Sequence, residues 1–448
     1  MKKLWQKDWE LEKAIEIFET QGDMKNDQKL VEFDVYGTLA HVMMLKKIGI
    51  LTEAELQTVK KGLLDVLSLN KSGNFKLEEG DEDIHTKIEN FITEKCGEVG
   101  KKIHTGRSRN DQVLTDLRLF TKSNLLQVWK EVISMADSFN SFAKKYEFVS
   151  MPGYTHMQKA MPSSVGMWAG AFTEGLLDDL DIIKAAYATN NKSPLGSAAA
   201  YGVPLPLDRE YTAKLLGFGA LQKNSLYSQN SRGKVESEVI SSLLPVFLDI
   251  NRFASDVMLF TTSEYGYFEV DKRLCSGSSI MPQKKNVDVA ELLRSKVNLV
   301  LGYYVESVSL SSNLTSGYAR DMQDGKKPLF QTLELATDMM RAANVLLSSM
   351  SPNAEKMKKA MTSEIFATHN ALGMTLEGMP FRDAYKLAEK AAQKWMPDDI
   401  DKLIKGSKHT GGTGNLGLEG YAEQIKSEKK AFEKEYESFS STIKNLTS

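Results

Sequence analysis

Five very long runs of regularly spaced apolar residues, between about residues 111 and 347, constrain the fold more than any other feature of the sequence. In the first run, apolar residues from Val113 to Ala143 recur every three to five positions, as on one face of an α-helix. The other runs begin near residues 165, 235, 289 and 329, after brief Gly/Pro/Ser connections. No β-type alternation competes with this period. The sequence therefore predicts an all-α protein with an elongated central bundle of five long helices.

The 448 residues exceed one ordinary core, and the runs suggest where the chain divides. Before the first run, a Trp-containing start and shorter apolar segments favour helix, and Thr52 to Glu55 has the spacing of a capping box. Pro245 should bend or break the third run locally. After the fifth run the segments become short again. We expect an N-terminal helical domain (1–106), a central long-helix domain (107–352) and a C-terminal helical domain (353–448).

The long helices also predict self-association. Several runs are apolar around more than one face, and an elongated bundle exposes its sides. Other copies of the chain would cover these faces, so we expect a homo-oligomer. The alternative is a monomer whose outer domains cover them.

Charge and cysteine usage exclude several classes of partner. Lys plus Arg (57) nearly equals Asp plus Glu (59), so no overall field selects nucleic acid or an anionic membrane. No apolar stretch is long enough to cross a bilayer, and the first residues lack the apolar centre of a signal peptide. The two cysteines and six scattered histidines form no metal-binding pattern. We expect a cytoplasmic protein without metal, nucleic-acid or membrane partners.

A polar segment, residues 276–286, separates the third and fourth runs. Ser278 follows a glycine that lets the backbone bend, while Lys284 and Asn286 supply a cation and an amide two positions apart. These groups could bind an anion, although the same composition is ordinary in a surface loop.

Three more polar stretches lie at the ends of long runs. Residues 104–111 place two arginines before a helix start, which suits either an anion site or a helix capped by Asn110 or Asp111 with solvated arginines. Residues 151–158 place His156 beside a threonine, as for a general acid or base, but a lone histidine is more often structural. Residues 318–326 offer a phenol, a guanidinium, an amide and an ammonium, or simply form a solvated loop.

Together the four stretches resemble those of a known family. Residues 277–286 (GSSIMPQKKN) match the signature of the fumarase/aspartase superfamily at all ten positions. Residues 104–113 (HTGRSRNDQV) and 318–326 are similar to argininosuccinate lyases rather than to fumarases, aspartases or adenylosuccinate lyases. The similarity runs from Gly22 to Ala384, over essentially the whole chain.

The resemblance implies reversible elimination of argininosuccinate to arginine and fumarate, without metal or organic cofactor. It implies a homotetramer that pools its long helices and builds each active site from three subunits. Ser278 would remove the Cβ proton, His156 with Thr155 would lie on the acid side, and Lys284 with Asn286 would hold the charge that develops on the carboxylate. Glu291 would partner the histidine, although its spacing from Asp288 also suits a capping box.

The resemblance also implies a substrate-binding set drawn from the N-terminal segments, from the stretches 104–111 and 318–326, and from Arg232 between them. Its members are Asp23, Asp27, His85, Ser108, Arg109, Asn110, Arg232, Tyr318, Gln323 and Lys326. The sequence departs from the family at three places: Val287 replaces the usual Pro, Arg232 lacks acidic neighbours, and Asp23 stands where many relatives carry Ser. A catalytically silent structural relative, or another fumarate-releasing lyase of the superfamily, is the alternative function.

Overall fold

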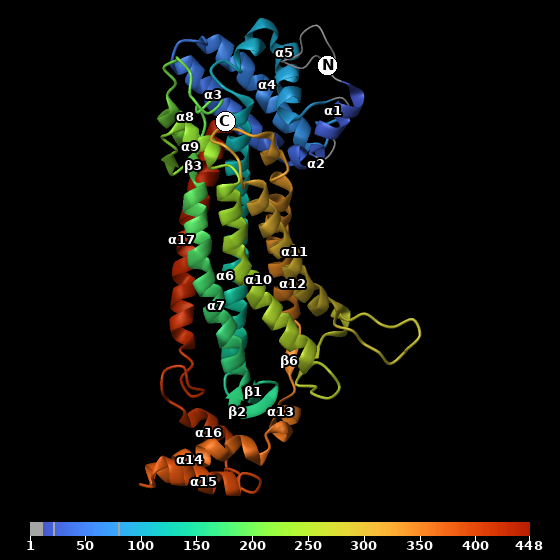
Figure 1. The fold of residues 1–448 in the computed structure, drawn as a ribbon, viewed down its shortest axis with the longest axis vertical. Helices are drawn as coiled ribbons and strands as arrows, with labels where there is room; N and C mark the ends of the chain where they lie inside the picture. Colours follow the sequence, from blue (N-terminus) through green and yellow to red (C-terminus); the bar gives the residue numbers. More distant parts are fainter. Residues whose placement is uncertain (1–11, 21–22, 79–80) are drawn as a thin grey trace.

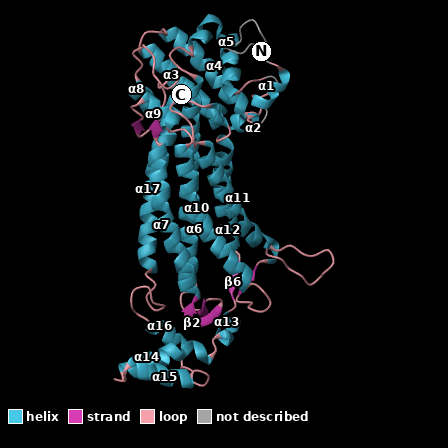
Figure 2. Cartoon of the chain, in the orientation of Figure 1, coloured by secondary structure: helices cyan, strands magenta, loops and turns pink. Residues whose placement is uncertain are grey.

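The computed structural model describes residues 12–20, 23–78 and 81–448, and the regular structure within them is predominantly helical (Figures 1 and 2). Five long helices run side by side along the molecule: α6 (Arg109–Lys145), α7 (Val165–Asn190), α10 (Lys234–Phe260), α11 (Asp288–Leu310) and α12 (Lys326–Ser348). At 1.5 Å per residue, the 37-residue α6 is about 55 Å long. The predicted all-α fold with an elongated five-helix bundle is confirmed.

Aromatic side chains hold the centre of the bundle together. Phe139 of α6 is fully buried and stacks on Phe172 of α7, with ring centroids 5.0 Å apart. The ring of Phe253 from α10 meets Phe139 edge-on at 5.1 Å. Each such buried side chain contributes roughly 1.5–3 kcal/mol from the hydrophobic effect. Helix α10 continues through Pro245 without ending there.

The N-terminal helices cover one end of the bundle (Figure 1). They are α1 (Lys13–Thr20), α2 (Met24–Asp27), a 3-10 turn (Gln28–Leu30), α3 (Val31–Lys47), α4 (Glu53–Lys71), α5 (Ile84–Cys96) and a second 3-10 turn (Gly97–Lys102). Thr52 and Glu55 form the predicted capping box at the start of α4. The Trp-containing start of the chain, residues 1–11, and Gly22 lie outside the described residues.

Short strands, which the sequence analysis did not predict, occur at the bundle ends. The pairs are β1 (Ser150–Thr155) with β2 (Gln158–Ser164), β3 (Lys192–Ser193) with β4 (Ala220–Leu221), and β5 (Phe268–Val270) with β6 (Met350–Pro352). They escaped prediction because strands of two to seven residues give too little alternation to read. Short helices lie near them: α8 (Arg209–Leu215), α9 (Ser225–Asn230) and a 3-10 turn (Lys272–Leu274).

The last hundred residues begin with short helices beyond the far end of the bundle. These are α13 (Ala354–Ala360), a 3-10 turn (Ser363–Phe366), α14 (Ala367–Leu376), α15 (Phe381–Ala391) and α16 (Ile400–Gly406). The final helix, α17 (Leu418–Thr447), then returns along the bundle to the N-terminal end (Figure 1). We expected only short helices here, and α17, with 30 residues, contradicts this.

Helix α17 was missed because most residues between the apolar positions of its packed face, which recur every seven residues from Leu418 to Leu446, are charged or polar. It attaches partly through a cation: the Lys122 ammonium lies 4.8 Å from the centre of the Phe439 ring and donates to Asn191 at 2.8 Å. The division into domains 1–106, 107–352 and 353–448 remains a prediction. Within the described ranges, no helix is both long and apolar enough to cross a membrane.

A buried histidine joins the N-terminal helices to the start of the bundle. His41 of α3 is 1% exposed, and its Nε2 lies 2.9 Å from the carbonyl oxygen of Thr105, just before α6. Burial, with a smaller contribution from Arg107, lowers the pKa of His41 to about 3. The folded protein therefore keeps this imidazole neutral at moderately acidic pH.

We predict a matching loss of stability in acid. Below pH 6.5 His41 is protonated in the unfolded chain, whereas in the folded chain it stays neutral until the pH approaches 3. Stability from this group is complete above pH 6.5 and declines towards pH 3, by about 1.4 kcal/mol per pH unit. His41→Gln, whose amide can still donate to Thr105, should flatten the dependence of the urea midpoint on pH. His409→Gln, on an exposed turn, should not; equal slopes in all three proteins would refute the prediction.

Candidate active site

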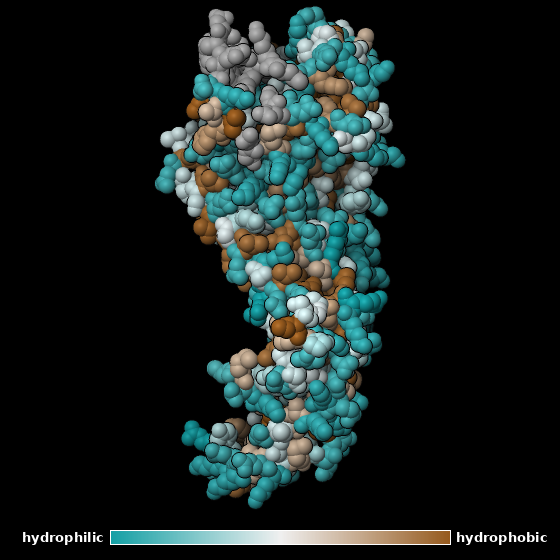
Figure 3. Space-filling view, turned by 90° about the vertical axis from the view of Figure 1, so that its right-hand side faces the viewer, coloured by the Kyte–Doolittle hydropathy of each residue, from teal (hydrophilic) through white to brown (hydrophobic). Residues whose placement is uncertain are grey.

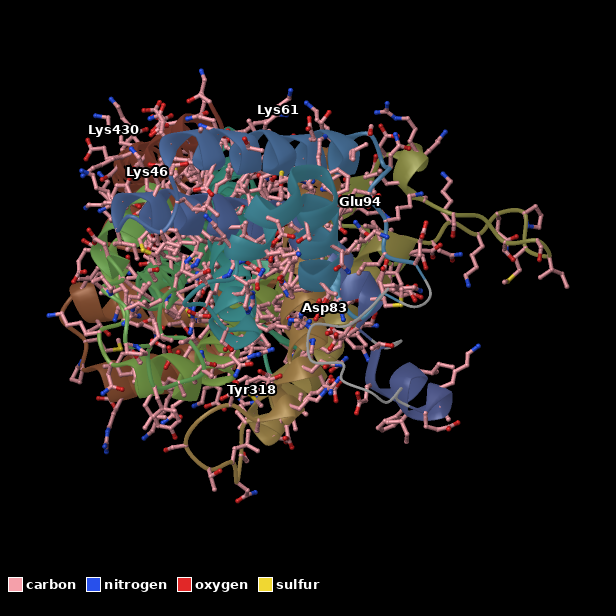
Figure 4. All side chains as sticks on the ribbon, turned by 90° about the horizontal axis from the view of Figure 1, so that it is seen from above. Lys46, Lys61, Asp83, Glu94, Tyr318 and Lys430 are labelled. Carbon is pink, nitrogen blue, oxygen red and sulfur yellow. The ribbon has the colours of Figure 1, made fainter. Side chains whose placement is uncertain are left out.

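A cavity of about 400 Å³ lies at the N-terminal end of the bundle, between α2, α5 and the starts of α6 and α12. Figure 4, viewed from above, shows Asp83 and Tyr318 from its wall on the same side of this end. Nine of the ten residues predicted to bind substrate line it: Asp23, Asp27, His85, Arg109, Asn110, Arg232, Tyr318, Gln323 and Lys326. The tenth, Ser108, lies next to Arg109 and caps α6.

The start of α6 is fixed by its own side chains. The Ser108 Oγ accepts from the backbone N–H of Asn110 at 3.3 Å, and Asp111 accepts from the N–H of Ser108 at 2.9 Å. Ser108 is therefore the N-cap, rather than Asn110 or Asp111. Arg109 is not left in solvent, because it donates to Asp83 at 2.6 Å and to Thr86 at 2.8 Å. The sequence analysis missed Asp83, which fixes this arginine on the cavity wall.

Lys326, the first residue of α12, forms a buried ion triad with Asp23 and Asp27. Burial opposes the charge on Lys326, but the two carboxylates outweigh it and raise the lysine pKa. Burial also raises the pKa of Asp23 despite the lysine, with Asp27 adding repulsion. One cation thus balances two carboxylates.

Arg232 presents an unpaired guanidinium to the cavity. Its side chain lies over the Tyr318 ring, 5.2 Å from the centroid, and one Nη donates to the Met322 carbonyl at 3.3 Å. Its buried Nε has no hydrogen-bond partner, and within the described part of the chain no carboxylate forms an ion pair with it. Gln323 donates to the backbone of Glu19 at 2.8 Å, which joins this wall to α1. A guanidinium in this state is suited to a ligand carboxylate.

His85 sits on two buried carboxylates behind the cavity wall. Its Nδ1 donates to Asp34 at 2.6 Å and lies 3.5 Å from Asp116. The Gln112 amide also donates to Asp34, at 2.6 Å. Ligand atoms of the three titratable residues lie within 4.8 Å of one another, as a metal site requires. The His85 and Asp34 atoms that a metal would need already hydrogen-bond to each other, so the donor set fits a proton network better than a metal.

The two carboxylates differ in protonation. Burial disfavours the charge on Asp34, but the hydrogen bond and charge of His85, with Arg107, hold the pKa of Asp34 below its usual value. Burial and repulsion from Asp34 hold the pKa of Asp116 well above its usual value. The sequence analysis missed both residues. Asp116 lies on the same helical face as Val113 and Phe120, and a carboxylate on an apolar face is the signal that could have found it.

Thr155 and His156 lie at the opposite end of the bundle, at the tip of the β1–β2 hairpin (Figure 2). His156 and Met157 form its two-residue turn, with φ values of 52° and 61° that match a type I′ turn. Neither residue is glycine, so both pay a steric cost in this conformation. The Tyr154 hydroxyl holds the hairpin to Tyr267, at an O–O distance of 2.6 Å. The tip itself is exposed in a single chain.

The polar segment 276–286 forms a loop that projects sideways from the bundle beside α11 (Figure 1). Its base is closed by two backbone hydrogen bonds of 3.0 Å between Ser276 and Asn286. Within the loop, Ser278 Oγ accepts from the backbone N–H groups of Ile280 and Met281 at 3.3 and 3.1 Å. The loop, including Lys284, is exposed for most of its length.

Glu291 occupies the first turn of α11, after this loop. Val287 is the N-cap, and no side chain caps the helix, so the alternative of a capping box between Asp288 and Glu291 is wrong. In the described part of the chain, no hydrogen bond or ion pair joins Glu291 to His156. One chain thus groups the predicted binding residues, but holds His156 at the far end and Ser278 on a lateral loop.

Known proteins resemble this chain in sequence and in fold. A family model described as "Lyase" matches residues 11–302. The fold is shared with EDDS lyase in complex with formate (TM-score 0.80, 24% identity, 98% of this chain and 95% of that one). It is also shared with class II fumarase from Schistosoma mansoni (TM-score 0.72, 17% identity, 94% of each chain). The protein is therefore a lyase of the fumarase/aspartase superfamily.

Curated sequences give the family within that superfamily. The argininosuccinate lyase of Thermotoga neapolitana is 41% identical over 87% of this chain and 98% of its own length. That of Parabacteroides distasonis is 39% identical over 95% of each. The chain belongs to the argininosuccinate lyase family.

The ion triad gives a prediction about stability. Lys326→Met leaves two buried carboxylates without their cation and should cost about 3 kcal/mol of unfolding free energy or more. Asp23→Asn keeps a one-to-one pair between Lys326 and Asp27, and should cost about 1 kcal/mol or less. Guanidinium unfolding followed by circular dichroism compares the two variants. A Lys326→Met protein with wild-type stability would contradict the prediction.

Proposed function

We propose that this lyase catalyses the reversible elimination of argininosuccinate to arginine and fumarate, in arginine biosynthesis. The observation that carries the proposal is the 41% identity with a curated argininosuccinate lyase over 98% of that protein's length. We further propose that the reaction needs neither metal nor organic cofactor, and that the enzyme works in the cytoplasm without nucleic-acid or membrane partners.

The cavity supports a substrate of mixed charge. Argininosuccinate carries three carboxylates, an amino group and a guanidinium group. Arg109, Arg232 and Lys326 supply cations on the cavity wall, while Asp23 and Asp27 supply anions. Charge-assisted pairs of this kind fix the orientation of a small polar ligand as well as its affinity. We propose the full predicted set, with Ser108, His85, Asn110, Tyr318 and Gln323, as the binding residues.

The loop supports a catalytic role for Ser278. We propose that its oxygen removes the Cβ proton, that the C–N bond then breaks, and that the departing guanidinium nitrogen receives a proton on the His156 and Thr155 side. Lys284 and Asn286 hold the charge that builds up on the adjacent carboxylate. The backbone N–H groups of Ile280 and Met281, which already face the serine oxygen, favour its anionic form. Glu291 partners the histidine.

The separation of these groups within one chain supports a shared active site. We propose a homotetramer in which the cavity of one chain receives the hairpin tip of a second and the 276–286 loop of a third. Apolar side chains lie exposed on the bundle surface that Figure 3 faces, where copies could pack. Those on α11 are Leu292, Leu299, Leu301, Val305 and Val308.

The role of Ser278 as the catalytic base can be tested by substitution. Wild-type protein should release fumarate from argininosuccinate, followed by its ultraviolet absorbance, whereas Ser278→Ala should be slower by at least about 1,000-fold. Because the Ser278 hydroxyl, among the described residues, forms hydrogen bonds only within its own loop, substrate affinity and oligomer size should stay unchanged in calorimetry and light scattering. No fumarate from wild type would refute the proposed function. A silent relative would bind argininosuccinate without turnover, and another superfamily lyase would act on adenylosuccinate or aspartate instead.

Mixing two inactive variants tests whether the cavity and the 276–286 loop of one active site come from different chains. Ser278→Ala and Arg109→Ala proteins, each inactive, are mixed one to one, dissociated and reassociated. If loop and cavity come from different chains, random assembly leaves about one quarter of the sites with both groups intact, so activity returns. If both come from one chain, no intact site can form and the mixture stays inactive. Each variant treated alone is the control.

A further inference from the structure

We propose that Asp34 and Asp116, which are buried behind the cavity, are positioning residues for His85 in substrate binding. Asp34 accepts a hydrogen bond from the Nδ1–H of His85 and so leaves Nε2 for the ligand, and Asp116 holds Asp34 by donating its carboxylic O–H to it. This inference rests on the proposed function and adds to it two residues outside the cavity lining.

The geometry leaves His85 only one free nitrogen. Its Nδ1 is 2.6 Å from Asp34, which is fully buried on α3. Among the described residues the buried Nε2 atom has no hydrogen-bond partner, while His85 itself lines the cavity. With the Nδ1 proton directed to a carboxylate, Nε2 is the nitrogen of His85 that is left for a ligand, and a polar group of the ligand can satisfy it.

Hydrogen bonds to both carboxylate oxygens fix the orientation of Asp34. Gln112 of α6 donates to the same oxygen as His85, at 2.6 Å, and Thr38 donates to the other oxygen at 3.3 Å. Arg107 in turn donates to Thr38 at 2.9 Å. The carboxylate therefore receives hydrogen bonds from α3, α5 and α6, the three helices that meet behind the cavity.

Asp116 completes this arrangement only as a neutral acid. It is fully buried, and within the described residues neither of its oxygens receives a hydrogen bond. A second carboxylate charge beside Asp34 would be buried without compensation. A carboxylic O–H has an acceptor within reach, since the carboxyl groups of Asp116 and Asp34 lie close enough to hydrogen-bond to each other. The raised pKa of Asp116 agrees with this protonation.

Paired substitutions test the proposal. Asp34→Asn should raise KM for argininosuccinate about tenfold and leave kcat within about twofold, because binding through His85 is lost but the chemistry is not. Asp116→Asn, whose amide can donate as the carboxylic acid does, should leave KM within about twofold. Asp116→Leu, of similar size without a donor, should raise KM as Asp34→Asn does. Melting temperature and oligomer size show whether a variant is simply damaged.

A double-mutant cycle then tests whether Asp34 acts through His85. In a His85→Gln background, Asp34→Asn should change KM by less than about twofold. If Asp34→Asn raised KM by the same factor in wild type and in His85→Gln, the positioning role would be overturned. A purely structural role of Asp34 would weaken substrate binding equally in both proteins. Asp116→Asn as damaging as Asp116→Leu would overturn the neutral-acid role, since it would mean that the charged form of Asp116 is needed.

A spectroscopic measurement separates this proposal from the proposed function. In protein with 15N-labelled histidine, without substrate, a proton on the Nδ1 of His85 should give a downfield signal that disappears in His85→Gln and moves or vanishes in Asp34→Asn. If that signal is present but wild type releases no fumarate, the proposed reaction fails and the hydrogen-bond network stands. If wild type is active but the proton is on Nε2, the positioning role fails alone.

Discussion

The packing of α6 along its whole length governs where every polar group of this protein can lie. The helix begins at Arg109 on the cavity wall and ends at Lys145, a few residues before the hairpin that carries His156. Buried residues occur along the helix from Asp111 to Ala143, and Phe139 packs its C-terminal part against α7 and α10, so the helix cannot bend to bring its ends together. A helix of about 55 Å thus holds two polar stretches near its ends far apart. The same burial that stabilises the bundle prevents one chain from closing the proposed active site.

The N-terminal end of the bundle differs from its apolar middle in carrying buried charges. Lys326 is balanced by Asp23 and Asp27, and Arg109 by Asp83. Such groups are tolerated only where partners satisfy them, because burial of an isolated charge is strongly unfavourable. Arg232 is the exception, since it contacts a ring and a carbonyl, and among the described residues no carboxylate forms an ion pair with it, although Asp23 lies near enough to feel its charge. An unsatisfied cation among satisfied ones indicates where a ligand anion belongs.

Sequence reasoning was most successful where a long pattern or a complete motif was available. The period of the apolar runs predicted the five bundle helices, and the resemblance carried the residues that line the cavity. It failed where few residues carry the signal, as in the short strands and in the choice of Ser108 as the cap of α6, and it overlooked α17, whose apolar residues are separated by many charged ones. Asp34 and Asp116 have no sequence signature, because they come together only when α3 and α6 pack. Contacts of this kind depend on tertiary structure and cannot be read from local spacing.

Two features of the hairpin tip oppose the stability of an isolated chain. His156 and Met157 both adopt a left-handed conformation that is costly without glycine, and the Met157 side chain is 64% exposed. Asn-Gly would form the same type of turn at less cost. Burial of the tip against another surface would offset the steric cost of His156 and Met157, and a requirement for His156 at the tip would explain why glycine does not replace it. The proposed tetramer provides both, since it places the tip against the cavity of another chain. In the proposed tetramer, the strained hairpin tip of one chain and the Arg232 guanidinium of another chain then belong to the same active site.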